Sequence, residues 1–306
     1  MLKVTFLGSG GAVPSVKRGL PAVALKYNQL FLWDCGEGTQ REMMKRGVGY
    51  GGVDGIFITH MHLDHFLGVF GLLETIRMTT GRESVPVYAP KRFRDVLAAL
   101  SPSQMWRPEF LDFREMGPGT LYRGKDYEIQ GFRVKHTGKD SFGVAFVEDD
   151  KVKFDEKKAK SAGLKGRMFT KIQKKGWVKV GGKKVKLSDV SKVRKGRKVV
   201  YSGDTMPCEA VVEMAKGADV LIHDGTFGER IKDEAFARGH TSVSDAARIA
   251  KKVKVKTLVL THISTRHSQE EKELLGEARG IFKNSYVAKD GMSIEVKPDG
   301  KQVVSF

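Results

Sequence analysis

Four side chains of the types that bind metal ions lie within six positions of this chain: His60, His62, Asp64 and His65. Imidazole nitrogens and carboxylate oxygens are common ligands of divalent metal ions. The alternative is a surface loop that is rich in histidine and binds nothing. We favour metal binding, because short His-rich tracts usually bind metal.

The residues around this cluster predict how it is positioned. Residues 56–58 are the apolar run Ile-Phe-Ile, which is typical of a buried strand. In extended backbone the first two histidines point to the same side. The aspartate and the third histidine follow where the chain turns toward a helix expected around residues 66–78. The two groups of ligands can therefore face two metal ions.

Three later strands are also expected to end in metal-ligand residues. The carboxyl ends of strands in α/β sheets form a binding edge, so we expect these side chains to join the first cluster. The resulting seven ligands are enough for two ions that share one carboxylate. The later ligands and their strands are His136 (132–136), Asp204 (199–204) and His262 (258–262).

Two further polar residues lie next to expected elements. His240 directly precedes an amphipathic helix expected at 243–252, where backbone N–H groups favour an anion such as phosphate. Asp34 ends a hairpin expected over residues 22–33. It has two open interpretations: it orients a metal-bound imidazole, or it is a local structural residue that forms an Asx-turn or caps the helix expected at 39–46.

The order of the expected elements predicts an α/β fold, because strands alternate with helices along the chain. A glycine cluster at 8–11 follows the first strand, but Pro14 follows it instead of a helix. That arrangement argues against a dinucleotide-binding fold. Strands and histidines recur on both sides of residues 150–198. We therefore expect two related halves, packed sheet to sheet with helices outside.

The composition predicts a globular, basic protein, since 40% of the 306 residues are hydrophobic and the formal net charge is +18. The two cysteines form no CxxC pair, which fits a reducing compartment, and we expect a cytoplasmic protein. The N-terminus lacks the pattern of a signal peptide, and no apolar run approaches the length of a membrane span. We therefore expect no membrane association.

Most of the positive charge lies in residues 151–198, which hold 19 Lys and Arg against three acidic residues. This concentration favours contact with nucleic acid over a solvated basic linker, because Lys and Arg neutralise phosphates. Residues 178–187 alternate around Gly181-Gly182 and predict a β-hairpin within a protruding arm. The lysines expected to contact the substrate are Lys171, Lys174, Lys175, Lys183 and Lys184.

Together these residues resemble the metallo-β-lactamase superfamily, whose motif is His-x-His-x-Asp-His, and within it the ribonuclease Z family. The resemblance implies a single four-layer αβ/βα sandwich domain over residues 1–306. It also implies that residues 151–197 are an inserted basic arm that binds tRNA. The matching segments are 6–10, 34–40, 60–65, His136, 202–205, 239–240 and 261–262.

The resemblance implies how two divalent ions would be shared among the ligands. The all-N/O donor set favours Zn²⁺, with Mn or Fe as alternatives. One ion would be held by His60, His62 and His136, the other by Asp64, His65 and His262, and Asp204 would bridge them.

The candidate catalytic residues are Asp64, His240 and Asp224. The resemblance implies that His240, supported by Asp224, is a general acid or a phosphate holder. The alternative for His240 is a helix-capping role. The family usually has Glu at the position of Asp224, which leaves open whether this shorter side chain reaches His240.

The resemblance implies an endoribonuclease that removes the 3′ trailer of precursor tRNA by two-metal hydrolysis, leaves a 3′-OH and acts as a homodimer. Lys17, Arg18 and Thr241 would contact the substrate, the first two from a loop that senses the 3′-CCA end in relatives. One alternative is a phosphodiesterase for small substrates or cyclic nucleotides, which the basic arm argues against. Another is a non-catalytic RNA-binding protein, which the intact set of seven ligands argues against.

Overall fold

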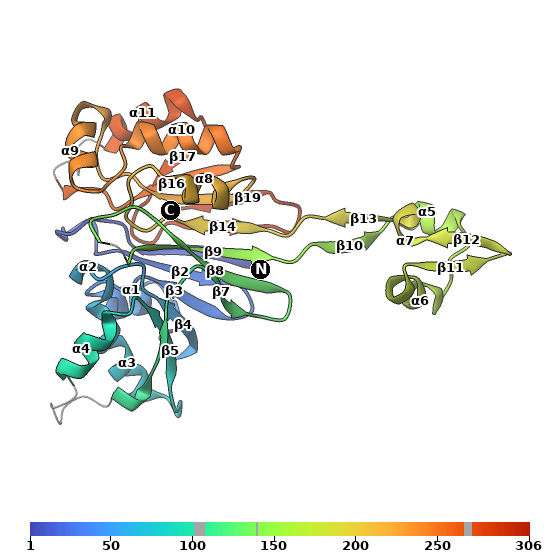
Figure 1. Cartoon of the computed structure of the whole chain (residues 1–306), viewed down its shortest axis with the longest axis horizontal. Helices are drawn as coiled ribbons and strands as arrows, with labels where there is room; N and C mark the ends of the chain where they lie inside the picture. The colour runs from blue at the N-terminus through green and yellow to red at the C-terminus, as the bar shows by residue number, and fades with distance from the viewer. Residues whose placement is uncertain (101–107, 139, 266–270) are drawn as a thin grey trace. The chain divides into compact units, whose positions relative to one another are not determined.

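In the computed structural model, two facing β-sheets are each covered by helices on their outer side, which gives four layers (Figure 1). The structure describes residues 1–100, 108–138, 140–265 and 271–306. Met1–Val147 and Arg197–Phe306 form one compact unit, which we call the core unit. Glu148–Gly196 form a second, which we call the inserted unit.

The first sheet has eight strands in the order β19-β18-β1-β2-β3-β4-β5-β6. Its antiparallel strands lie on one side, and β3 to β6 run parallel. Leu2, Val4 and Phe6 point from β1 into the core between the sheets. The strands are β1 Leu2–Gly8, β2 Ala22–Lys26, β3 Leu30–Trp33, β4 Val53–Phe57, β5 Val85–Ala89, β6 Leu111–Glu115, β18 Ser293–Val296 and β19 Gln302–Ser305.

The second sheet has seven strands in the order β17-β16-β15-β14-β9-β8-β7. It too combines antiparallel strands with a parallel run, here from β14 to β17. The two sheets share this plan, but they do not coincide with the expected halves before and after residues 150–198. The strands β7, β8 and β9 of the second sheet precede that segment, and β18 and β19 of the first sheet follow it, so each half contributes to both sheets. The strands are β7 Gly119–Arg123, β8 Tyr127–Arg133, β9 Phe142–Glu148, β14 Lys198–Tyr201, β15 Val220–Asp224, β16 Thr257–Thr261 and β17 Ser285–Val287.

The helices of the core unit cover the outer faces of the two sheets and bury an apolar side against them (Figure 1). None of the described helices is long and apolar enough to cross a membrane. On the first sheet they are α1 Thr39–Lys45, α2 Leu63–Phe66, α3 Gly68–Thr79 and α4 Phe93–Leu100. With the second sheet belong α8 Glu209–Ala215, α9 Lys232–Ala237, α10 Val243–Val253 and α11 Glu271–Ile281. Single 3₁₀ turns lie at Tyr50–Gly52, Pro108–Phe110 and Glu229–Ile231.

The element ends differ from the sequence expectation near the metal-ligand residues. The strands β4, β8 and β14 end three residues before His60, His136 and Asp204, so these side chains lie on loops. Asp64 and His65 lie in the helix α2 rather than in a turn before it. The ligands are thus carried just beyond the carboxyl ends of the strands.

The inserted unit is a small folded module rather than an unstructured linker. Its core comprises Ala159, Leu164, Ile172, Val178 and Val190. The predicted hairpin is confirmed, with a turn of two glycines that both have positive φ, as a type I′ turn requires. Its elements are β10 Lys151–Phe154, α5 Glu156–Ser161, α6 Met168–Lys175, β11 Trp177–Val180, β12 Lys183–Lys186, α7 Leu187–Val190 and β13 Ser191–Arg194.

Candidate metal centre and active site

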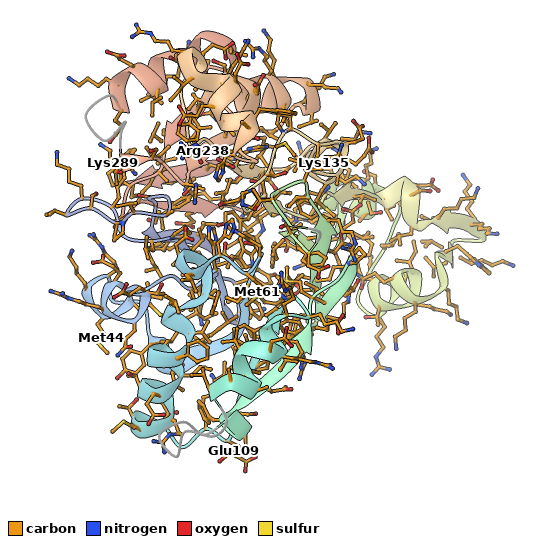
Figure 2. All side chains as sticks on the ribbon, turned by 60° about the vertical axis from the view of Figure 1, so that its left-hand side comes forward. Met44, Met61, Glu109, Lys135, Arg238 and Lys289 are labelled. Atoms are coloured by element: carbon orange, nitrogen blue, oxygen red, sulfur yellow. The ribbon has the colours of Figure 1, made fainter. Side chains whose placement is uncertain are left out.

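The loops that follow β4, β8, β14 and β16 bring the predicted ligands together. Within each of two groups, one ligand atom per residue lies within 4.8 Å of the others. In Figure 2 the labelled residues Met61 and Lys135 mark two of these segments, since they adjoin His60 and His136. The first group is His60, His62, His136 and Asp204, and the second is Asp64, His65 and His262.

In the first group three imidazole nitrogens converge on one point. His62 Nδ1 lies 3.0 Å from His60 Nε2 and 3.2 Å from His136 Nε2. Asp204 Oδ2 lies 3.7 Å from His60 Nε2. Three imidazoles and a carboxylate at this spacing match the donor set of a four-coordinate Zn²⁺ site.

The second group shares the same carboxylate. Asp204 Oδ2 lies 3.3 Å from His65 Nε2 and 3.1 Å from His262 Nε2. Asp64 Oδ2 lies 3.4 Å from the former nitrogen and 3.5 Å from the latter. Asp204 is therefore in reach of both groups, as a bridging ligand must be.

Each imidazole has its second nitrogen fixed by a neighbour, which leaves one nitrogen free for a metal ion. His65 Nδ1 contacts Asp34 Oδ2 at 2.8 Å, and His136 Nδ1 contacts the Gly239 carbonyl at 2.8 Å. Nε2 is the free atom in four of the five rings, and Nδ1 is the free atom in His62. The remaining contacts are His60 Nδ1 to Thr59 Oγ1 at 3.0 Å, His262 Nδ1 to Thr226 Oγ1 at 2.8 Å and His62 Nε2 to Thr137 Oγ1 at 3.4 Å.

Asp34 orients an imidazole, which was one of its two open interpretations. Its carboxylate is fully buried and, besides contacting His65, accepts hydrogen bonds from the Thr59 N–H at 2.8 Å and the Tyr201 hydroxyl at 2.8 Å. Its backbone φ is +57°, a region that Asp and Asn enter more readily than most residues. The strained backbone at the strand end thus positions a carboxylate behind the site.

The chemistry of the buried atoms fits a bound cation. Asp204 Oδ1, His65 Nε2 and His262 Nε2 are buried and have no hydrogen-bond partner among the residues that the structure describes. Burying polar atoms without partners is costly, and metal ions would satisfy all three atoms. The residues present therefore fit divalent metal ions.

The electrostatics of the first group favour neutral ligands. Burial is the largest influence on the pKa of His60, His62 and His136, and it lowers each pKa. A neutral imidazole is the form that binds metal. Burial raises the pKa of Asp204, but the nearby His262 and His65 outweigh it and hold that pKa well below its usual range.

His240 and Asp224 form a hydrogen-bonded pair beside the metal-ligand groups. Asp224 Oδ2 lies 2.8 Å from His240 Nδ1, so the shorter carboxylate does reach. Burial lowers the pKa of His240, but Asp224 more than compensates and raises it to about 9. The His240 ring stacks on that of His262 with centroids 5.0 Å apart. The residue at the N-cap of α10 is Ser242, not His240.

Two of the residues expected to contact the substrate are buried instead. Arg18 is 4% exposed, and its guanidinium donates to Ser9 Oγ at 2.7 Å and pairs with Glu271 at 3.1 Å. Thr241 is fully buried and donates its hydroxyl to the Thr205 carbonyl at 2.5 Å. Both side chains hold loops in place. Lys17, next to Arg18, is exposed.

The five predicted substrate-binding lysines all lie in the inserted unit, on α6 and the β11–β12 hairpin. All five are exposed, and none forms an ion pair within the described residues. By contrast, the stem of the same unit pairs Arg194 with Glu148 at 3.2 Å and Lys195 with Asp150 at 2.7 Å.

Two residues in contact with the site were missed by sequence reasoning. Thr226 holds His262 and also donates its hydroxyl to Asp224 Oδ1 at 2.7 Å. Tyr201 donates to Asp34 from the opposite sheet. A hydroxyl residue two positions after Asp224 gave only a weak signal, and nothing local indicated Tyr201.

Comparisons with known proteins place the chain in a family. The family model described as Anti-Pycsar protein Apyc1 matches residues 2–171, and the model described as Beta-lactamase superfamily domain matches residues 148–263. A ribonuclease Z from Archaeoglobus fulgidus is 40% identical over 98% of this chain and 99% of its own length. One from Methanosarcina mazei is 39% identical over 98% of this chain and 100% of its own length.

The crystal structure of human tRNase Z, short form, agrees with the fold described above. It superposes with a TM-score of 0.67 and 27% sequence identity, covering 96% of this chain and 99% of its own. The relatives match nearly the whole length, including both units. The chain belongs to the ribonuclease Z family and has the metallo-β-lactamase fold.

Proposed function

We propose that this protein is an endoribonuclease that removes the 3′ trailer of precursor tRNA by metal-dependent hydrolysis. The observation that supports this most is the buried Asp204 carboxylate, which lies within 3.1–3.7 Å of imidazoles from both ligand groups. It occurs in a chain 40% identical to a ribonuclease Z. Membership of that family favours tRNA over a small phosphodiester as the substrate.

We propose that two Zn²⁺ ions occupy the site. His60, His62 and His136 would hold one, Asp64, His65 and His262 the other, and Asp204 would contact both. Two such ions would lower the pKa of a water molecule and hold the scissile phosphate. The fixed second nitrogens of the imidazoles keep the ligand atoms in place, so little reorganisation is needed on binding.

The proton that the leaving group needs would come from His240. A product with a 3′-OH requires the bond between phosphorus and the 3′-oxygen to break, so that oxygen leaves and takes up a proton. Asp224 keeps His240 protonated at neutral pH, since it raises the pKa of that imidazole to about 9. A protonated imidazole at this position can both bind the phosphate and donate the proton. Asp64 would act on the other side of the reaction: one of its carboxylate oxygens would bind metal, and the other could accept a proton from the attacking water.

The inserted unit would bind the body of the tRNA. Its lysines on α6 and the hairpin, which pair with no acid among the described residues, can neutralise several phosphates at once. Lys17 is the exposed cation of the loop 14–18 in the core unit and is proposed to contact the 3′ end of the RNA. Arg18 and Thr241 would act by holding their loops.

We further propose a cytoplasmic homodimer, as the family resemblance implies. The helix α2 and the residue after it expose Leu63 (61%) and Leu67 (41%), apolar side chains that a second copy could cover. Sedimentation velocity would test this. A monomer at micromolar concentration would contradict it.

The proposed function is tested with the metal-loaded protein and a precursor tRNA that carries a 3′ trailer. We expect cleavage after the discriminator base, with a 3′-OH on the tRNA and a 5′-phosphate on the trailer. His65→Ala and Asp64→Asn should lose this activity. Asp112→Asn, which changes an exposed carboxylate on β6, is the matched control and should retain it.

The products separate this proposal from its alternatives. Turnover of bis-p-nitrophenyl phosphate without cleavage of any precursor tRNA would favour a small-substrate phosphodiesterase. Tight RNA binding with neither activity would favour a non-catalytic RNA-binding protein. Either result would contradict the proposal.

A further inference from the structure

The β11–β12 hairpin of the inserted unit has two chemically different faces. Alternate residues of a strand share a face, and in this hairpin Trp177 pairs with Lys186 and Lys179 with Lys184. These four side chains therefore lie on one face, which is open to solvent. The other face carries the valines that pack into the small core of the unit, Val178, Val180 and Val185.

Trp177 is unusual among the aromatic side chains of this unit, because 40% of it is exposed although an indole is large and apolar. The Lys184 ammonium lies 4.7 Å from its ring centroid, a cation–π contact. Lys179, Lys184 and Lys186 form no ion pair with a carboxylate within the described residues. The face is thus an indole beside three cations that no carboxylate of the described chain neutralises.

The stability of the hairpin explains only in part why Trp177 and three lysines share this exposed face. Cross-strand pairs with an aromatic residue stabilise a hairpin, and Lys stems pack on aromatic rings. Three like charges around one exposed indole instead raise the free energy of the unbound unit. Bound phosphates would remove that repulsion, and a nucleobase would cover the indole. Both occupants belong to one kind of ligand, a nucleic acid.

We propose that Trp177 is a stacking platform for a nucleobase of the RNA substrate, with Lys179, Lys184 and Lys186 on the adjoining phosphates. This inference rests on the proposed function and adds a base contact to it. Stacking on an aromatic ring is tolerant of sequence, because every base has a π-face. Such a contact suits an enzyme whose substrates share a folded shape but differ in sequence. The bases available for stacking are the unpaired ones in RNA loops and at RNA ends.

The test compares Trp177→Thr, which keeps β-strand propensity but removes the ring, with Trp177→Phe, which keeps an aromatic ring. We expect Trp177→Thr to raise KM for trailer-bearing tRNA by about 10-fold, with kcat unchanged. Trp177→Phe should keep KM within about three-fold of the wild-type value. Hydrolysis of bis-p-nitrophenyl phosphate should be unaffected in both. RNA should quench the protein fluorescence less in Trp177→Phe than in the wild type.

Salt dependence separates stacking from charge. Trp177→Thr should leave the slope of log KM against log salt unchanged, whereas Lys179→Ala should reduce it by about one. Val193→Thr is the matched control, because Val193 is an apolar residue of the same unit that is 60% exposed. It should leave KM unchanged. Circular dichroism and thermal melting would verify that each variant folds.

A wild-type KM in Trp177→Thr would overturn the inference, and so would a Trp177→Phe variant no better than a folded Trp177→Thr. A lower sedimentation coefficient for Trp177→Thr with unchanged KM would assign this face to a contact between copies of the chain and also overturn it. If the wild type cleaves no trailer-bearing tRNA, the proposed function fails. RNA quenching of Trp177 then still decides whether this face binds a base.

Discussion

The two units of this chain place their charges in opposite ways. In the core unit the acids at the site are buried, with Asp34 and Asp224 fully covered and Asp204 3% exposed, and each faces histidines at hydrogen-bond or ion-pair distance. In the inserted unit there are 17 Lys and Arg against six acids. The lysines of α6 and the hairpin are exposed, and they form no ion pair in the part of the chain that the structure describes.

The two tasks require different amounts of structure. Bond cleavage needs ligand atoms fixed within tenths of an ångström, so two sheets and their buried carboxylates surround one point. Binding a phosphate backbone needs positive charge on a stable surface, and a core of five buried residues is enough for that. Substitutions at the site in the core unit should therefore reduce the hydrolysis of every substrate. Substitutions in the inserted unit should reduce the cleavage of RNA alone.

The largest expected effect on the core unit comes from Asp204→Asn, which removes the carboxylate shared by both ligand groups. We expect loss of bound metal and a fall of at least about 100-fold in activity on both trailer-bearing tRNA and bis-p-nitrophenyl phosphate. Because metal binds only the folded state, zinc should raise the melting temperature of the wild type more than that of the variant. Equal zinc stabilisation of both proteins would contradict the ligand assignment.

Asp34→Asn should have the next largest effect. It removes the carboxylate charge that orients His65, but Asp34 is not itself one of the proposed metal ligands. We expect a 10- to 100-fold loss of zinc affinity, measured by titration calorimetry. Asn tolerates the positive φ at this position, so the backbone should be retained. Asp54→Asn is the control, since Asp54 accepts a backbone hydrogen bond from Leu30 on the same sheet. Unchanged affinity in Asp34→Asn would refute the orienting role.

Asp224→Asn should change the pH dependence of kcat/KM, because it removes the carboxylate beside His240. In the wild type, His240 is protonated below a pKa of about 9, so the acid form is present at neutral pH and is lost as pH rises through 9. Without the carboxylate the pKa falls toward the ordinary histidine value of about 6.5. The alkaline limb of the kcat/KM profile should then move to lower pH. An unmoved limb would show that His240 is not the acid.

The smallest effects are expected from single lysines of the inserted unit. Lys183→Ala should raise KM for tRNA a few-fold and reduce the slope of log KM against log salt by about one, because one phosphate contact is lost. Lys301→Ala, which removes a solvent-exposed lysine of the core unit, should leave the slope unchanged. Similar slopes in both variants would mean that the charge of the inserted unit is not specific to RNA contact.

The structure brings together the seven residues that the sequence proposed as metal ligands, and their grouping was predictable because four of them are close in the sequence. Four of the seven lie within six positions, and the others follow apolar strands. The Gly181-Gly182 hairpin was equally predictable, since its turn type demands positive φ at both positions. The helix α2 was missed because its N-cap residue, His62, makes no side-chain capping bond.

What the sequence could not predict depends on contacts between distant segments. The burial of Arg18 depends on Glu271 and the Ala288 carbonyl, which lie 253 and 270 residues away. The pairing of Tyr201 with Asp34 crosses from one sheet to the other over 167 residues. No local sequence pattern indicates either contact. Arg18 therefore looked like an exposed loop cation, and Tyr201 looked like an ordinary strand residue.

One variant can test whether the core unit performs the hydrolysis and the inserted unit binds the RNA. Lys151 and Arg194 are paired in the stem of the inserted unit, so Asn-Gly can replace residues 152–193 and close a two-residue hairpin. The contacts of Arg194 with Glu148 and of Lys195 with Asp150 are kept.

The measurement is the ratio of kcat/KM for trailer-bearing tRNA to kcat/KM for bis-p-nitrophenyl phosphate in this variant and in the wild type. We predict that the ratio falls at least about 100-fold, because the loss of several phosphate contacts weakens RNA binding alone. Hydrolysis of the small diester should stay within about two-fold of the wild-type rate. An unchanged ratio with both activities present would contradict the account, and so would the loss of small-diester hydrolysis in a variant that still folds.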